Sequence, residues 1–124
     1  MKATIKKKWL KALRSGEYKQ GKYWLKNADS FCCLGVLCDI HAKETEDFWC
    51  REDEKYDGEV WSLDGYPDHL PPRVIEWAGL KVSHGASLEV DFEDKGIKTL
   101  TLPELNDDYN KSFKEIADLI EEQL

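Results

Sequence analysis

The sequence predicts one small α+β domain, in which an antiparallel sheet packs with an N-terminal helix, a buried cysteine-rich helix and a C-terminal helix. The chain has 124 residues, which is the usual size of a single domain. Amphipathic helical patterns stand at both ends, and short strand patterns lie between them. One apolar run, residues 31–40 (FCCLGVLCDI), is the longest in an otherwise polar chain and is expected to supply the core.

Residues 3–15 have the pattern of an amphipathic helix. Ile5, Trp9 and Leu13 recur at helical spacing and form one apolar face. Gly16 supplies the left-handed position that commonly follows a helix. Residues 17–26 are rich in aromatic side chains, which favours two short extended pieces around Gln20 and Gly21.

The apolar run is predicted to begin as a strand at Phe31 and to continue as a helix over residues 33–42. Periodicity alone does not separate a strand from a buried helix in such a run. Asp29 or Ser30 is expected to cap the helix. Gly35 costs about 1 kcal/mol relative to alanine inside a helix, so we expect a close packing contact at this position.

The second half of the chain contains an acidic stretch and a hairpin. Residues 43–60 carry eight acidic and three basic side chains, which predicts an acidic surface insert. Residues 70–79 are expected to form a short helix that begins with proline and ends at glycine. Residues 88–92 alternate as a half-buried strand does, and residues 97–102 are predicted to return as its hairpin partner.

Two capping sequences mark helix starts near the C-terminus. Thr101 and Glu104 have the spacing of a capping box for a single turn. Ser112 and Glu115 have the same spacing ahead of the C-terminal helix, which we expect to pack on the sheet.

The charge is divided unevenly along the chain. Residues 1–26 contain nine lysines and arginines and one acidic residue; because the whole chain carries −7, the remainder carries −15. A basic end on an acidic body favours an anion site or a self-association surface, so a homo-oligomer is one expectation. The acidic body argues against a duplex nucleic acid as partner.

The N-terminus lacks the apolar segment of a signal peptide, and the apolar run is about half the length that spans a bilayer. We therefore expect a cytoplasmic protein with no membrane partner and with reduced cysteines.

The four cysteines and His41 have the residue types of a zinc site. Their spacing is poor for one, because no C-x-x-C pair occurs among Cys32, Cys33, Cys38 and Cys50. Buried free cysteine behaves as a small apolar residue. We therefore expect structural cysteines, no metal and no cofactor, and we keep a cysteine- or metal-dependent enzyme as the third hypothesis for function.

Residues 14–24 interleave cations with aromatic rings. The candidate ligand-binding residues are Arg14, Tyr18, Lys19, Gln20, Lys22, Tyr23 and Trp24. Cations of this kind bind phosphate, aromatic rings stack on bases, and the amide of Gln20 is suited to a base edge. The alternative is an ordinary hairpin with solvated lysines and core-facing aromatic rings.

Four motifs occur in a characteristic order. They are ALRSGEYKQ at 12–20, FCCLGVLCD at 31–39, LPPRVIEWAGL at 70–80, and LND at 105–107 followed by SFKEIADLIE at 112–121. In this order they resemble a family of small uncharacterised proteins that is common in bacteriophage and prophage genomes. The resemblance implies a phage origin and action in the host bacterial cytoplasm, but no established activity.

The leading hypothesis is therefore a non-enzymatic phage binding protein. By analogy with other small phage proteins, we expect a counter-defence factor that sequesters a nucleotide-derived signalling molecule. The alternative is an acidic inhibitor of a host or defence protein, with exposed Phe48 and Trp49 at the contact and with its charge imitating nucleic acid.

Overall fold

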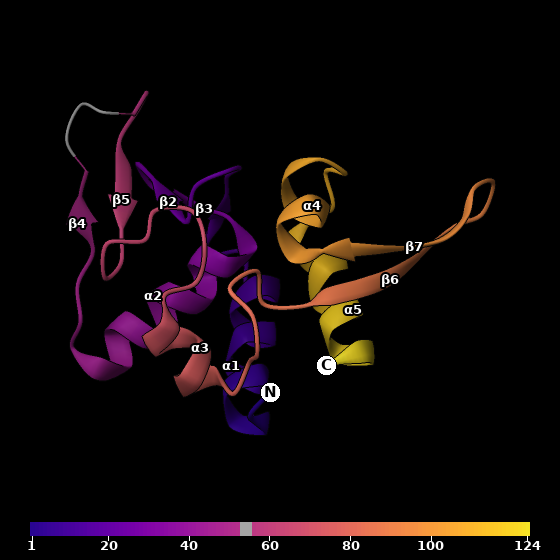
Figure 1. Cartoon of the computed structure of the whole chain (residues 1–124), viewed down its shortest axis with the longest axis horizontal. Helices are drawn as coiled ribbons and strands as arrows, with labels where there is room; N and C mark the ends of the chain where they lie inside the picture. The colour runs from indigo at the N-terminus through magenta and orange to yellow at the C-terminus, as the bar shows by residue number, and fades with distance from the viewer. Residues whose placement is uncertain (53–55) are drawn as a thin grey trace.

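The computed structural model describes residues 1–52 and 56–124 as one α+β domain (Figure 1). Its helices are α1 (Ala3–Arg14), α2 (Cys33–Thr45), α3 (Pro72–Ala78), α4 (Leu102–Asp107) and α5 (Phe113–Gln123). Its strands are β1 (Lys19–Gln20), β2 (Lys26–Asn27), β3 (Ser30–Phe31), β4 (Cys50–Arg51), β5 (Val60–Ser62), β6 (Ser87–Phe92) and β7 (Gly96–Thr101). The α+β expectation is confirmed.

The strands form two separate sheets. One has five short strands in the order β1-β3-β2-β5-β4, and the other is the β6–β7 hairpin. All neighbours are antiparallel except β1 and β3. The two extended pieces around Gln20 and Gly21 therefore do not pair with each other; β1 lies parallel to β3 instead.

The stretch of residues 43–60 is part of this architecture. Its first three residues complete α2, and it also supplies β4 and the first residue of β5. The predicted acidic insert also includes residues 53–55, which lie outside the described residues.

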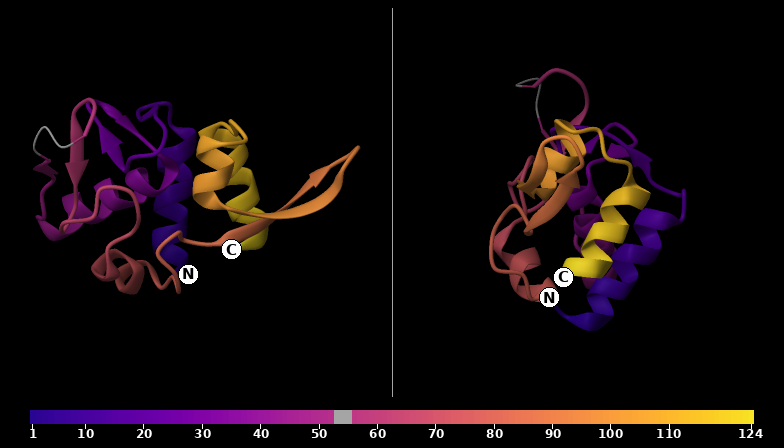
Figure 2. Two further views of the ribbon diagram at one scale, coloured as in Figure 1. Left: turned by 45° about the horizontal axis from the view of Figure 1, so that its top comes forward. Right: turned by 90° about the vertical axis from the view of Figure 1, so that its right-hand side faces the viewer.

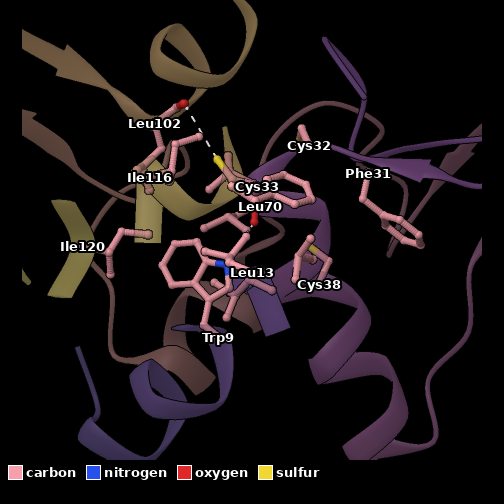
Figure 3. Packing of buried hydrophobic residues seen from close by; sticks show 14 of the residues in the cluster. Trp9, Leu13, Phe31, Cys32, Cys33, Cys38, Leu70, Leu102, Ile116 and Ile120 are labelled. Carbon is pink, nitrogen blue, oxygen red and sulfur yellow. Dashed lines mark hydrogen bonds between the residues drawn. The ribbon is translucent and has the colours of Figure 1, made fainter. Parts of the chain in front are cut away.

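Helix α2 is the centre of the core. Every residue from Cys33 to Cys38 is buried, which is typical of a helix enclosed on all sides. Figure 3 shows these cysteines among Trp9, Leu13 and Leu70 from neighbouring elements. The indole Nε1 of Trp9 donates to the carbonyl oxygen of Cys33 at 3.0 Å, which fixes α1 against the start of α2.

The cap of α2 differs from the prediction. Cys32 is the N-cap, because its sulfur accepts the backbone N–H of Gly35 at 3.4 Å. Ser30 lies in β3, where its hydroxyl donates to the carbonyl of Asn27 at 2.9 Å. The expectation of a cap at Asp29 or Ser30 is therefore wrong, because the short strand β3 already pairs Ser30 with its neighbours.

Gly35 allows α2 to touch the backbone of the preceding segment. A Cβ at this position would lie 1.7 Å from the carbonyl oxygen of Leu25. Leu25 is itself fully buried just before β2. The close contact expected at Gly35 is confirmed, and it sets the distance between α2 and the five-stranded sheet.

Helix α5 packs mainly along α1, with a smaller contact to β6 (Figure 2). Its apolar side begins at Phe113 and includes Ile116 and Ile120. Both expected capping boxes are present, at Thr101 with Glu104 and at Ser112 with Glu115. The expected packing on the sheet is thus a minor contact, because the apolar face of α1 takes most of that surface.

Replacing Gly35 by alanine should destabilise the protein although alanine is the better helix former. The gain in helix propensity is about 1 kcal/mol, but the added methyl group meets backbone rather than a mobile side chain. We expect a net loss of at least about 2 kcal/mol in the free energy of unfolding, measured by urea denaturation. An Ala12→Gly variant, which only lowers helix propensity in α1, should lose about 1 kcal/mol. Equal losses would contradict the close contact.

Candidate functional site

Arg14 is neutralised by carboxylates of α5. Its Nη2 donates to Asp118 at 2.7 Å and to Glu121 at 2.8 Å. The hydrogen bond with Glu121 raises the pKa of the guanidinium and lowers that of the carboxyl. The arginine thus joins α1 to α5, and its charge is already paired.

Gln20 belongs to an internal amide network. Its Nε2 donates to Asn106 Oδ1 and to the carbonyl of Lys111, each at 2.9 Å. Its Oε1 accepts the backbone N–H of Phe113 at 3.2 Å. Asn106, which is 1 % exposed, also accepts the N–H of Cys33. The amide predicted to read a base edge therefore joins β1 to α2, α4 and α5.

The other predicted residues point in several directions. Lys19 pairs with Asp29 at 3.7 Å, Lys22 bonds Asn110, Tyr23 is 61 % exposed, and the rings of Trp24 and Tyr56 lie 4.8 Å apart. None of the seven residues lines the cleft described below. The structure brings Tyr18 to a larger group of cations and rings, and Gln20 lies opposite Phe31 of that group, although its amide bonds to Asn106.

That group is a row across the five-stranded sheet. Phe31 lies opposite Lys26, Lys26 opposite Trp61, and Trp61 opposite Arg51. Directly opposite residues point to the same side of a sheet. With the flanking rings of Tyr18 and Trp49, these residues form what we call the cation–aromatic face.

Lys26 is at the centre of the cation–aromatic face. Its ammonium lies 4.9 Å from the ring centre of Trp61, 5.5 Å from that of Phe31 and 5.8 Å from that of Trp49. No carboxylate pairs with Lys26 among the described residues. The indole Nε1 of Trp61 is likewise buried without a hydrogen-bond partner within the described part of the chain.

Asp39 holds one side of this face in place. Its carboxylate accepts hydrogen bonds from Tyr18 Oη at 2.6 Å and Trp49 Nε1 at 3.1 Å, and it pairs with Lys43 at 3.1 Å. Burial alone raises the pKa of Asp39, but these three donors outweigh it and lower the pKa. Burial and the bond to Asp39 raise the pKa of Tyr18 to about 12.

Trp49 is accordingly half-buried against the core, whereas its neighbour Phe48 is 70 % exposed. Of the two aromatic residues predicted to be exposed, only Phe48 is.

The cysteines are divided between the core and the surface. Cys32, Cys33 and Cys38 are buried, while Cys50 is exposed on β4. Burial raises the pKa of Cys32 to about 12 and those of Cys33 and Cys38 well above the ordinary thiol value. Within residues 1–52 and 56–124, no three metal-binding side chains converge. The buried thiols serve as apolar packing groups.

A cleft of about 600 Å³ lies between the end of α2, α3 and the N-terminus. It is lined by Lys2, His41, Thr45, Glu46, Asp47, Arg73, Glu76 and Trp77. His41 is only 2 % exposed, its ring centre is 4.9 Å from that of Trp77, and its Nδ1 has no hydrogen-bond partner among the described residues.

The charges of this cleft are mixed. Arg73 already faces Asp47 at 3.4 Å and Asp64 at 3.8 Å. The lining carries three carboxylates and two cations, so the cleft does not favour an anion. Burial lowers the pKa of His41, which favours the neutral imidazole in this cleft.

A family model described as a domain of unknown function, DUF8296, matches residues 1–124. The chain belongs to the DUF8296 family. No curated protein and no solved structure gives a significant match. In the described part of this DUF8296 protein, none of the helices has the length and apolar character needed to cross a membrane.

Sequence reasoning missed Lys26, Phe31, Arg51 and Trp61 as a group. They lie 5 to 20 residues apart along the chain, and only the strand register of the DUF8296 fold puts them in one row. The local signal that could have pointed to this group is an aromatic residue two positions before a cation. It occurs at Trp24 before Lys26 and at Trp49 before Arg51.

His41 should make the stability of the protein depend on pH. Because burial lowers its pKa in the folded state, the unfolded chain takes up a proton first as the pH falls below about 6.5. The contribution of His41 to the unfolding free energy should therefore be complete above that pH. It should decrease towards pH 5, by at most about 1.4 kcal/mol per pH unit. A His41→Leu variant should lose this slope in urea denaturation at pH 5–7, whereas the exposed-site variant His69→Leu should keep it. An unchanged slope in His41→Leu would contradict the assignment.

Proposed function

We propose that this protein is a non-enzymatic binding protein for a nucleotide-like ligand, and that the ligand docks on the cation–aromatic face. The observation that carries the proposal is Lys26, an ammonium held over three aromatic rings with no carboxylate partner among the described residues. A nucleotide has the complementary chemistry, since its phosphate supplies the missing anion and its base supplies a planar ring.

The neighbouring residues support the same ligand class. Arg51, the next residue of the row, lies 6.0 Å from the ring of Trp61, and its one carboxylate contact among the described residues is the long 3.8 Å contact with Glu59. Two cations therefore flank one half-buried indole ring. Arg14, in contrast, has two close carboxylates, so it is a weaker candidate for a phosphate contact than the sequence suggests.

A binding role is favoured over cysteine chemistry by the state of the thiols. The nucleophile in such chemistry is the thiolate, and burial keeps three of the four thiols protonated. Together with the resemblance to bacteriophage proteins, this leads us to propose a counter-defence factor that sequesters a nucleotide-derived signal in the host cytoplasm. The phage context rests on the four sequence motifs alone.

Isothermal titration calorimetry with a panel of linear and cyclic nucleotides tests the proposal. The unaltered protein should bind at least one of them, and Lys26→Met should weaken that affinity by about tenfold or more because it removes a charged hydrogen-bond donor. Lys19→Met is the matched control: it changes the net charge by the same amount, at a strand position outside the row. Its affinity should stay within about twofold of that of the unaltered protein.

Two results would overturn this proposal. One is that no nucleotide binds. The other is that binding depends on Arg14 or Lys22 and not on Lys26, which would return the site to residues 14–24.

A protein–protein inhibitor is the second candidate, and Phe48 is the observation that favours it. This ring is 70 % exposed beside Glu46 and Asp47, as an anchor of an acidic contact surface would be. A protein captured from bacterial lysate by the tagged chain should be lost with Phe48→Ser and kept with Val82→Ser, which removes an exposed apolar side chain elsewhere. Loss with both variants would indicate nonspecific apolar adsorption and would contradict this candidate.

A further inference from the structure

The β6–β7 hairpin projects from the body of the protein beyond α4 and α5. Both Figure 1 and the left view of Figure 2 show it extending away from the five-stranded sheet. The hairpin forms a two-stranded sheet of its own, so within the described residues each strand has one edge without a neighbouring strand. Such edges present backbone donors and acceptors that a further strand can use.

The register identifies which backbone groups face outward. The N–H of Glu89 donates to the side chain of Gln123 at 2.7 Å, and its carbonyl accepts from the same amide at 2.8 Å. The backbone N–H and C=O of Glu89 therefore point away from β7, and so do those of Asp91 two residues later. In the facing strand, Thr99 lies opposite Glu89 and Ile97 lies opposite Asp91. The backbone N–H and C=O groups of Thr99 and Ile97 therefore point away from β6.

The two edges of the hairpin are treated differently. The side-chain amide of Gln123 already occupies the β6 edge, which also carries the acidic side chains of Glu89 and Asp91. On the β7 edge, the N–H and C=O groups of Ile97 and Thr99 have no partner among the described residues, and residues 96–101 contain no acid. The side chain of Ile97 is 68 % exposed.

We propose that a second copy of this chain pairs with the β7 edge, antiparallel and about a two-fold axis at Lys98. Ile97 of each copy then faces Thr99 of the other in a hydrogen-bonded pair. Each of these two pairs forms two N–H···O=C bonds, so all four unpartnered backbone groups on each strand are satisfied. The product is a continuous four-stranded antiparallel sheet with the order β6-β7-β7-β6. This interaction does not rest on the proposed ligand, whose site lies on the other sheet.

The neighbouring register, centred on Thr99, fits less well. It would place Ile97 opposite Thr101, but the N–H of Thr101 already donates to the capping carboxylate of Glu104 at 3.0 Å. The carbonyl of Ile97 in each copy would then lack a donor. The register centred on Lys98 leaves this cap intact.

Side chains are compatible with the register at Lys98. On one face, each exposed Ile97 meets the β-branched Thr99 of the second copy, a favourable cross-strand pair. On the other face, the two Lys98 side chains start close together, but each ammonium lies 5.8 Å from the ring centre of its own Phe92. The lysine charges are therefore drawn along the hairpins and not held at the axis.

Sedimentation velocity over micromolar to millimolar concentrations tests the dimer. The unaltered chain should show a concentration-dependent dimer. Thr99→Lys should raise its dissociation constant by at least about tenfold, because it replaces the residue that faces Ile97 of the other copy and adds a second cation beside each Lys98. Asp91→Lys adds a lysine on the β6 edge and should leave the dimer in place. A chain that remains monomeric at every concentration, or a dimer that tolerates Thr99→Lys, would overturn the proposal.

Cross-linking tests the register without depending on dimer strength. In a Cys50→Ser background, Lys98→Cys should form an intermolecular disulfide on mild oxidation, since directly opposite Cα atoms of a non-hydrogen-bonded pair lie about 4.5 Å apart. Thr99→Cys should not, because its two copies are displaced along the strands. A disulfide at Thr99→Cys and none at Lys98→Cys would overturn the register. Circular dichroism of each variant checks that the hairpin is folded.

Discussion

The contact between Gly35 and the carbonyl of Leu25 is the constraint on which the rest of the structure depends. It lets α2 lie directly on the segment that leads into β2, so the helix is enclosed by backbone on that side. Because Cys33 to Cys38 of α2 are buried on every side, neighbouring elements must cover each face of this part of the helix, and α1 does so through the bond from Trp9 to Cys33. Asn106 covers the start of α2 in the same way.

The sequence predicted the parts of this fold that are encoded locally. The apolar face of α1 and the capping boxes at Thr101 and Ser112 were visible because helix periodicity and caps extend over only a few residues. The parallel pairing of β1 with β3 was not, since strands of two residues carry no periodicity. Cys32 as the cap of α2 was missed because a thiol is an uncommon acceptor at that position.

The candidate site shows the same division between local and non-local information. Residues 14–24 looked like a binding segment because cations and aromatic rings are neighbours in the chain. In the fold they separate: Arg14 turns to α5 and Gln20 turns inward. The cation–aromatic face is instead assembled from residues 18 to 61 by strand register, which a local pattern does not encode. Its central cation, Lys26, lies just beyond the predicted segment.

The cysteine-rich stretch, finally, is a structural centre whose thiols fill the core. Thiol labelling with mass spectrometry, from native conditions through increasing urea, tests this most directly. Cys50 should react at once, and Cys32, Cys33 and Cys38 should react only through global unfolding, with the same free energy that urea denaturation gives. Labelling of Cys38 in the native protein as fast as that of Cys50 would contradict a core built around α2.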